Sequence, residues 1–319
     1  MVDFVKLKKG PEDDSSPKKK PQSVKIPLSL LRPQRRAFSW KRFFLLIVIF
    51  FLLSSIISSF LFSIAPKIAV VGISGVIVTG SGSTSSTVGS RDIIDILNTV
   101  KDDNSIKGVV LDINSPGGSP VASEEISNAI DNLKIEKPVY AVFNDVGASG
   151  AFWVGVSSDK LYASKMSLVG SIGVTSAGLG FENFIERYNI TYRRNVAGAY
   201  KDMGSPFKEP TDEENEMLQD ILDDIHLEFI NHVADSRNMS VNEVKKYANG
   251  EVFLGSRALD IGFVDAIGNY EDVLDDIKNI TEYDDAIVVD YSPRQTLAGI
   301  LGFENIFNLP TSESLVELK

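Results

Sequence analysis

The feature that most constrains this chain is an uncharged apolar run of 22 residues, FFLLIVIFFLLSSIISSFLFSI, from Phe43 to Ile64. A helix of this length covers about 33 Å, enough to cross the roughly 30 Å hydrocarbon core of a bilayer. We therefore predict one transmembrane helix at 43–64. A buried core helix is disfavoured because nothing apolar precedes the run. A cleaved signal peptide is disfavoured because the charged leader is long and the exit, Ser63-Ile64-Ala65-Pro66, lacks a small-residue cleavage pattern.

Charge is distributed very unevenly on the two sides of this run. Residues 1–42 hold 12 Lys and Arg against 4 Asp and Glu, whereas the rest of the chain has a net charge of −19. Lys41 and Arg42 adjoin the helix, so the positive-inside tendency places the N-terminus in the cytoplasm and the residues after the helix outside it. The leader, 1–42, is rich in Lys, Pro and Ser and is predicted to be disordered. The acidic body should repel nucleic acid, which excludes nucleic acid as a partner.

Two residue types exclude further classes of chemistry. The sequence contains no cysteine, so disulfides, thiol nucleophiles and thiolate metal sites are impossible. Its two histidines, His226 and His232, lie six residues apart on one predicted helix, a spacing that disfavours a shared metal site. We therefore expect neither a metal nor a cofactor.

After Pro66, short apolar runs alternate with helical patterns, which is typical of an α/β domain. We predict strands at 68–73, 76–78, 109–113 and 139–143, and helices at 91–100, 121–133, 149–156 and 213–234. The Gly-, Ser- and Thr-rich segment 80–90 is predicted to be a surface loop. The domain is expected to occupy 67–294. The tail, 295–319, carries scattered apolar residues and could contact another subunit, the membrane surface or a neighbouring groove.

Three polar or glycine-rich segments carry the candidate catalytic residues, each where a strand is expected to end. In DINSPGGS (112–119), glycines leave backbone N–H groups open to a substrate. In NDVGASG (144–150), Ser149 begins a helix, where free N–H groups favour negative charge. In GAYKDMGSPF (198–207), Lys201 lies among small or turn-forming residues. Taken singly, these patterns also fit a connecting turn, a helix N-cap and a surface lysine.

A serine hydroxyl is a poor nucleophile unless a base accepts its proton. Both histidines lie on an acidic helix, where solvated or core positions are the simpler interpretation. A lysine is the remaining choice, provided that burial lowers the pKa of its amine from about 10.4 toward neutrality. Serine–lysine pairs are an established variant of the catalytic triad.

The motifs SPGG, GASG and YKDMGSPF, in this order behind one apolar helix, resemble the short-form signal peptide peptidase A family. The resemblance covers residues 68–270 and includes FLGSRALDIGFVDAIG at 253–268. It implies a Clp protease/crotonase-like spiral α/β fold and a membrane-anchored serine protease. The implied site consists of Ser149 as nucleophile, Lys201 as base, Ser171 orienting the lysine, the N–H groups of Gly118 and Gly150 binding the oxyanion, and Gly117 contacting substrate.

The same resemblance implies a homo-oligomer, expected to be an octamer, in which neighbouring subunits supply the serine and the lysine of one site. The implied substrates are remnant signal peptides and other hydrophobic, extended peptides. Phe152, Trp153 and Leu168 are candidates for an apolar wall of the site, although core packing explains each equally well. After Ser149 the segment Ala151-Phe-Trp departs from the family's usual glycine and aromatic pattern, so the pocket's shape could differ.

Two other functions remain open on the sequence. One is a related membrane protease that cuts a stomatin-like partner, and the other is a catalytically silent scaffold that binds peptides. Three Asn-x-Ser/Thr sequences, at Asn189, Asn238 and Asn279, would face the outside in the predicted topology, and whether they are glycosylated is also open.

Overall fold

The computed structural model describes residues 40–84 and 86–293, excluding the side chains of 42 and 56–64. The chain divides into two compact units, residues 1–58 and 59–319. The tail predicted at 295–319 and all but the last three residues of the leader predicted at 1–42 lie outside the described residues. Both remain predictions.

Helix α1 (Trp40–Ile64) contains the apolar run for which a membrane helix is predicted. Within the part of the chain that the structure describes, no helix is both long enough and apolar enough to cross a bilayer. The transmembrane helix therefore stays a prediction.

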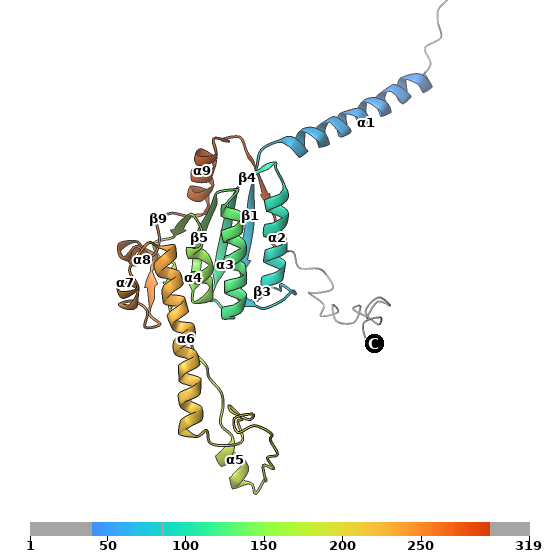
Figure 1. Ribbon diagram of the computed structural model, residues 1–319. Helices are drawn as coiled ribbons and strands as arrows, with labels where there is room; N and C mark the ends of the chain where they lie inside the picture. Colours follow the sequence, from blue (N-terminus) through green and yellow to red (C-terminus); the bar gives the residue numbers. More distant parts are fainter. Residues whose placement is uncertain (1–39, 85, 294–319) are drawn as a thin grey trace, which may run out of the picture. The chain divides into compact units, whose positions relative to one another are not determined.

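The second unit is an α/β structure built on a mainly parallel sheet, which confirms the α/β part of the predicted fold (Figure 1). The strand order is β10-β1-β4-β5-β6-β9, and all neighbours in this path are parallel. These strands are β1 (Lys67–Ser74), β4 (Ile106–Ser115), β5 (Val139–Ala148), β6 (Lys160–Ala163), β9 (Ala266–Ile267) and β10 (Ile287–Asp290).

Strand β5 is long enough to pair with two short strands in succession. Its first half pairs with β6, and its second half pairs with β7 (Leu168–Gly170). Strand β8 (Val252–Leu254) adds to β7 in the antiparallel direction. A separate pair, β2 (Val76–Val78) and β3 (Thr87–Gly89), also forms, so the loop predicted at 80–90 is interrupted by a short strand.

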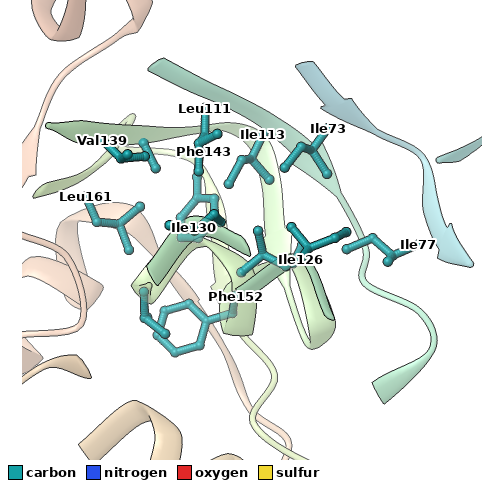
Figure 2. Close-up of a cluster of buried hydrophobic side chains, with 14 of the residues drawn as sticks. Ile73, Ile77, Leu111, Ile113, Ile126, Ile130, Val139, Phe143, Phe152 and Leu161 are labelled. Carbon is teal, nitrogen blue, oxygen red and sulfur yellow. The ribbon is translucent and has the colours of Figure 1, made fainter. Parts of the chain in front are cut away.

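The helices that cover one face of the sheet include α2 (Ser90–Asp102), α3 (Pro120–Lys134) and α4 (Gly150–Val156), as Figure 1 shows. Ile126 and Ile130, four residues apart on α3, lie on one helix face and are fully buried. Figure 2 shows them packed with Phe152 of α4 against side chains of the sheet such as Phe143. The predicted helices and strands of this layer are confirmed, with ends that differ by a few residues.

Helix α9 (Tyr270–Thr281) covers the opposite face of the sheet. Its buried residues Val273, Leu274 and Ile277 pack against Val110 and Tyr140. Asn269 caps the helix by accepting hydrogen bonds from the N–H groups of residues 271 and 272. The sheet therefore has two apolar layers, as expected for strands that are hydrophobic on both faces.

The other helices among the described residues are α5 (Glu182–Arg187), α6 (Asp212–Ser236), α7 (Val241–Lys245) and α8 (Gly255–Ile261). Helix α6 is buried mainly toward its C-terminal end, through Phe229, Ile230, Val233 and Ala234. Figure 1 shows its other end reaching away from the sheet to the segment that carries α5. Asn189 and Asn238 follow α5 and α6 with positive φ angles of 52° and 51°, a conformation that asparagine tolerates at helix ends.

Candidate active site

Ser149 lies at the sharp turn between β5 and α4. Its backbone is in a rare conformation for a residue with a side chain, with φ 53° and ψ −125°, which costs on the order of 1–3 kcal/mol. Its N–H donates to the carbonyl of Gly170 at 2.8 Å, and its carbonyl accepts from the N–H of Trp153 at 3.0 Å. Its side chain makes no capping hydrogen bond to the described residues. Ser149 is therefore not a simple N-cap, and its hydroxyl is available for chemistry.

Ser171 is brought beside Ser149 by the pairing of β5 with β7. The register aligns Ala148 with Gly170, so a serine follows each member of the last aligned pair. Ser171 also has a positive φ, 55°, and its N–H donates to the carbonyl of Glu251 at 2.7 Å. Residues 22 positions apart in the sequence thus lie at the edge of one cavity.

The glycines of the SPGG motif pack directly against the Ser149 turn. Gly117 has φ +93°, and a Cβ there would lie 2.6 Å from the nitrogen of Gly150 and 2.7 Å from the carbonyl oxygen of Ala148. Gly118 contacts β2, where a Cβ would lie 2.0 Å from the carbonyl oxygen of Ile77. No side chain fits at either position without moving backbone, which explains why both are glycine.

The N–H groups of Gly118 and Gly150 adjoin the same cavity. A Cβ built on Gly150 would lie 3.3 Å from the nitrogen of Gly118, so the two peptide groups are neighbours. Neither N–H donates a hydrogen bond to any atom of the described residues. Two free donors beside a serine hydroxyl match the requirement for binding a developing oxyanion.

The cavity that these residues share has a volume of about 490 Å³. Its polar edge includes Gly118, Ser149, Gly150 and Ser171, and much of the rest of its wall is apolar. The apolar lining consists of Pro120, Trp153, Val174, Ile225 and Phe229. This size and composition suit a site that accepts hydrophobic side chains of an extended peptide.

Of the three residues for which both the apolar wall and the core were open, the structure places one in the wall. Trp153 lines the cavity. Phe152 is fully buried in the core, where its ring contacts Phe143 and Phe263, so the core alternative is the one confirmed for it. Leu168 is 45% exposed and is absent from the cavity lining.

His226 lines the cavity, although its place on an acidic helix favours a solvated or core position. Its Nε2 is buried and has no hydrogen-bond partner among the described residues. No signal in the sequence distinguished it from His232, because both lie on the same acidic helix. The difference is decided by which turn of α6 faces the cavity.

His232 supports the wall from behind. Its ring stacks on Trp153, with centroids 4.4 Å apart and planes within 8°. Its Nε2–H donates to the carbonyl of Trp153 at 3.0 Å. Burial lowers the pKa of His232 below its usual value, because desolvation penalises the charged ring.

Lys201 does not line the cavity of its own chain. It is exposed, in a turn where its N–H donates to the carbonyl of Gly198 at 3.2 Å. Its neighbour Tyr200 donates a hydrogen bond to Glu213, in the first turn of α6. The cavity residue Ile225 lies 12 positions further along that helix, or about 18 Å at 1.5 Å per residue. A single chain therefore holds the lysine turn and the serine cavity at two separate places along α6.

The sequence is similar to a known family and to several known proteins. The sequence model of peptidase family S49 matches residues 131–283, which include Ser149, Ser171 and Lys201. A protein of Enterococcus faecium named putative signal peptide peptidase SppA is 36% identical over 229 residues, 70% of this chain and 67% of that protein. A putative protease of Methanocaldococcus jannaschii is 32% identical over 202 residues, 63% of this chain and 65% of that protein.

Protease 4 of Haemophilus influenzae is also similar, with 33% identity over 233 residues. These residues are 72% of this chain but only 38% of Protease 4. The chain therefore matches somewhat less than two fifths of that longer relative, and about two thirds of each of the other two.

Proposed function

Because the chain belongs to peptidase family S49 and is a serine protease of the signal peptide peptidase group, we propose that Ser149 is the nucleophile that attacks the scissile peptide bond. The observation that carries this proposal is the position of Ser149, which lies in the cavity at a strained strand-to-helix turn. Strained backbone at a strand-to-helix turn is a known way of exposing a nucleophilic hydroxyl.

The oxyanion of the tetrahedral intermediate would be bound by the N–H groups of Gly118 and Gly150. Both line the cavity, and neither donates to another described residue. Donors fixed by the backbone need no reorganisation when charge develops on the carbonyl oxygen, and one such donor is worth about 100- to 1,000-fold in kcat. Gly117, packed against Ser149 and Gly150, holds the two donors at this spacing.

The proposed base is the amine of Lys201 from a neighbouring subunit. Its neutral amine accepts the Ser149 hydroxyl proton as the oxygen attacks the carbonyl, and then donates that proton to the leaving amine. Water next attacks the acyl-enzyme with the same amine as base, which releases the second product and restores Ser149. The hydroxyl of Ser171, beside Ser149, would orient the amine by a hydrogen bond.

The separation of the Lys201 turn from the Ser149 cavity along α6 favours a catalytic site that two subunits share. The lysine turn lies against the first turn of the helix, and the cavity lies against its later turns. A lysine stem of four carbons is too short to bridge a separation of about 18 Å. In a head-to-tail ring, Lys201 of each chain could enter the Ser149 cavity of the next chain, although the two residues are separated within one chain. We propose an octamer with the Clp protease/crotonase-like spiral fold, with which the parallel sheet is compatible.

The proposed substrates are remnant signal peptides and other extended, hydrophobic peptides. The apolar wall of the cavity supports this choice, as does the name of the relative from Enterococcus faecium. We further propose that the run from Phe43 to Ile64 anchors the chain in the cell membrane, with the N-terminus in the cytoplasm and the catalytic unit outside it. Such an anchor would hold the enzyme where these peptides are released.

The test uses the full chain in detergent and a fluorogenic apolar peptide. Ser149→Ala and Lys201→Ala should each abolish hydrolysis, and Ser149→Ala should also abolish labelling by a serine-directed covalent probe. Full hydrolysis by either variant would refute the proposed pair. A wild-type protein that binds the peptide but neither cleaves it nor reacts with the probe would instead be a scaffold.

A further inference from the structure

The turn that carries Lys201 contains a nearly buried carboxylate in an otherwise exposed segment. Every hydrophobic side chain between residues 176 and 210, all of which the structure describes, is exposed or half-buried. The side chain of Asp202, in contrast, is only 10% exposed. Burying a carboxylate is costly unless charged partners surround it. Charge pairing rather than an apolar core therefore fixes this turn.

Arg194 and Lys208 are the partners of Asp202. Arg194 contacts it with two nitrogens: Nη2 donates a hydrogen bond to Oδ1 at 2.8 Å, and Nε lies 2.5 Å from Oδ2 without forming a hydrogen bond to it. Nη2 of Arg194 also donates to the carbonyl of Ala199 at 3.0 Å, and Nζ of Lys208 lies 3.6 Å from Oδ1 of Asp202. The hydrogen bond from Arg194 lowers the pKa of Asp202, so the carboxylate remains charged at neutral pH.

The same network is anchored to the first turn of α6. Nζ of Lys208 lies 2.5 Å from Oε1 of Glu214, whose side chain is 3% exposed. The other oxygen of Glu214 accepts the N–H of Thr211 at 3.0 Å, which completes the capping box of the helix. Since Tyr200 is bonded to Glu213, both sequence neighbours of Lys201 are tied to this helix end.

We propose that Asp202 is a positioning residue that, through Arg194 and Lys208, fixes the Lys201 turn on α6 so that the amine meets Ser149 of the adjoining subunit. The inference rests on the proposed function, in which Lys201 is the base. A flexible turn would leave the amine in many orientations, and a misplacement of about 1 Å at a reacting group costs about 100-fold in rate. The network removes that freedom without touching the amine itself.

The experiment compares Asp202→Asn, Arg194→Gln and the double variant with the wild-type chain in detergent. The readouts are kcat and KM on a fluorogenic apolar peptide, the thermal unfolding temperature and the size of the assembly. We expect Asp202→Asn to lower kcat about 10- to 100-fold with KM and assembly size unchanged. The double variant should be no slower than the slower single variant, because both act through one ion pair.

Glu209→Gln is the matched control, since Glu209 is an exposed carboxylate near the same turn with no ion pair to the described residues. It should leave kcat unchanged. Arg194→Lys keeps the charge but loses the two-nitrogen contact, so it should give an intermediate kcat at an unchanged unfolding temperature.

Two results would overturn the inference. One is a normal kcat in Asp202→Asn while Lys201→Ala is inactive. This result would refute the positioning role of Asp202 but not the proposed role of Lys201 as the base. The other is loss of folding or assembly in both Asp202→Asn and Arg194→Lys, because the contacts would then be purely structural. Full activity in Lys201→Ala would instead refute the proposed function.

Discussion

The backbone N–H of Ser149 donates a 2.8 Å hydrogen bond to the carbonyl of Gly170. This bond extends the pairing of β5 with β7 by one step and sets Ser171 beside Ser149. The position of the candidate site therefore depends on how long β5 remains paired. A strand that stopped at its contact with β6 would leave Ser149 without this anchor.

Mixed assemblies of two inactive variants should regain activity. If Ser149 and Lys201 of one site come from different chains, co-assembling Ser149→Ala with Lys201→Ala creates some sites with both groups intact. At equal, random mixing in a ring, about a quarter of the sites are restored. The measurement is hydrolysis of the fluorogenic peptide after co-expression, with each variant alone as the control. Persistent inactivity in verified mixed rings would show that one chain supplies both groups.

Gly117→Ala should lower both the unfolding free energy and kcat/KM by more than the positive φ of Gly117 alone explains. Gly262 is a matched control, because its φ of +90° is close to the +93° of Gly117 while an added Cβ meets nothing within 4 Å. Gly262→Ala should cost about 1–2 kcal/mol of unfolding free energy and leave kcat/KM unchanged. Gly117→Ala should cost more and lower kcat/KM by about 100-fold or more, since its Cβ displaces the Gly150 peptide. Equal effects on kcat/KM would contradict this role of Gly117.

His226→Leu should tighten the binding of apolar peptides. Nε2 of His226 is buried in the cavity wall without a partner among the described residues, so removing it should change the unfolding free energy by less than about 0.5 kcal/mol or stabilise the fold. KM for an apolar peptide should fall while kcat is maintained. His226→Gln, which keeps a polar group, is the control. A loss of kcat as large as in Ser149→Ala would reveal a catalytic role for this histidine.

Stability should decline in mild acid because of His232. Its ordinary pKa is 6.5, and burial lowers the value in the folded chain. Between the two values the unfolded chain binds a proton and the folded chain does not, so the unfolding free energy is maximal above about 6.5 and falls as the pH drops toward the lowered value. Asp131, Lys134 and Asp235 also act on this ring electrostatically.

Urea unfolding at pH 7.5 and 5.5 measures this effect. The wild-type protein should lose more stability between these two pH values than His232→Gln, whose amide can still donate to the carbonyl of Trp153 but does not titrate. If both proteins lose the same amount, other groups dominate the acid response.

The sequence predicted the α/β class and most elements of the layer that holds Ser149. These predictions rely on local spacing, such as the four-residue interval of Ile126 and Ile130 on α3, which tertiary contacts only reinforce. Strand β3 was missed because Thr87–Gly89 is too short and too polar in its surroundings to give a periodic signal. The sequence could not predict which residues line the apolar wall of the cavity. Successive helix residues point about 100° apart, and no local pattern indicates that Phe152 faces the core and Trp153 the cavity.

By itself, the sequence determined the order and spacing of the motifs around Ser149, Ser171 and Lys201, because these are properties of the chain alone. It also determined the alternation of strands and helices, because hydrophobic periodicity is local. Only the tertiary structure decided that Gly118 and Gly150 adjoin Ser149 and that α6 holds the Lys201 turn away from its own cavity. The physical reason is that such contacts depend on strand register and on the rigid length of a helix, which relate residues far apart in the sequence.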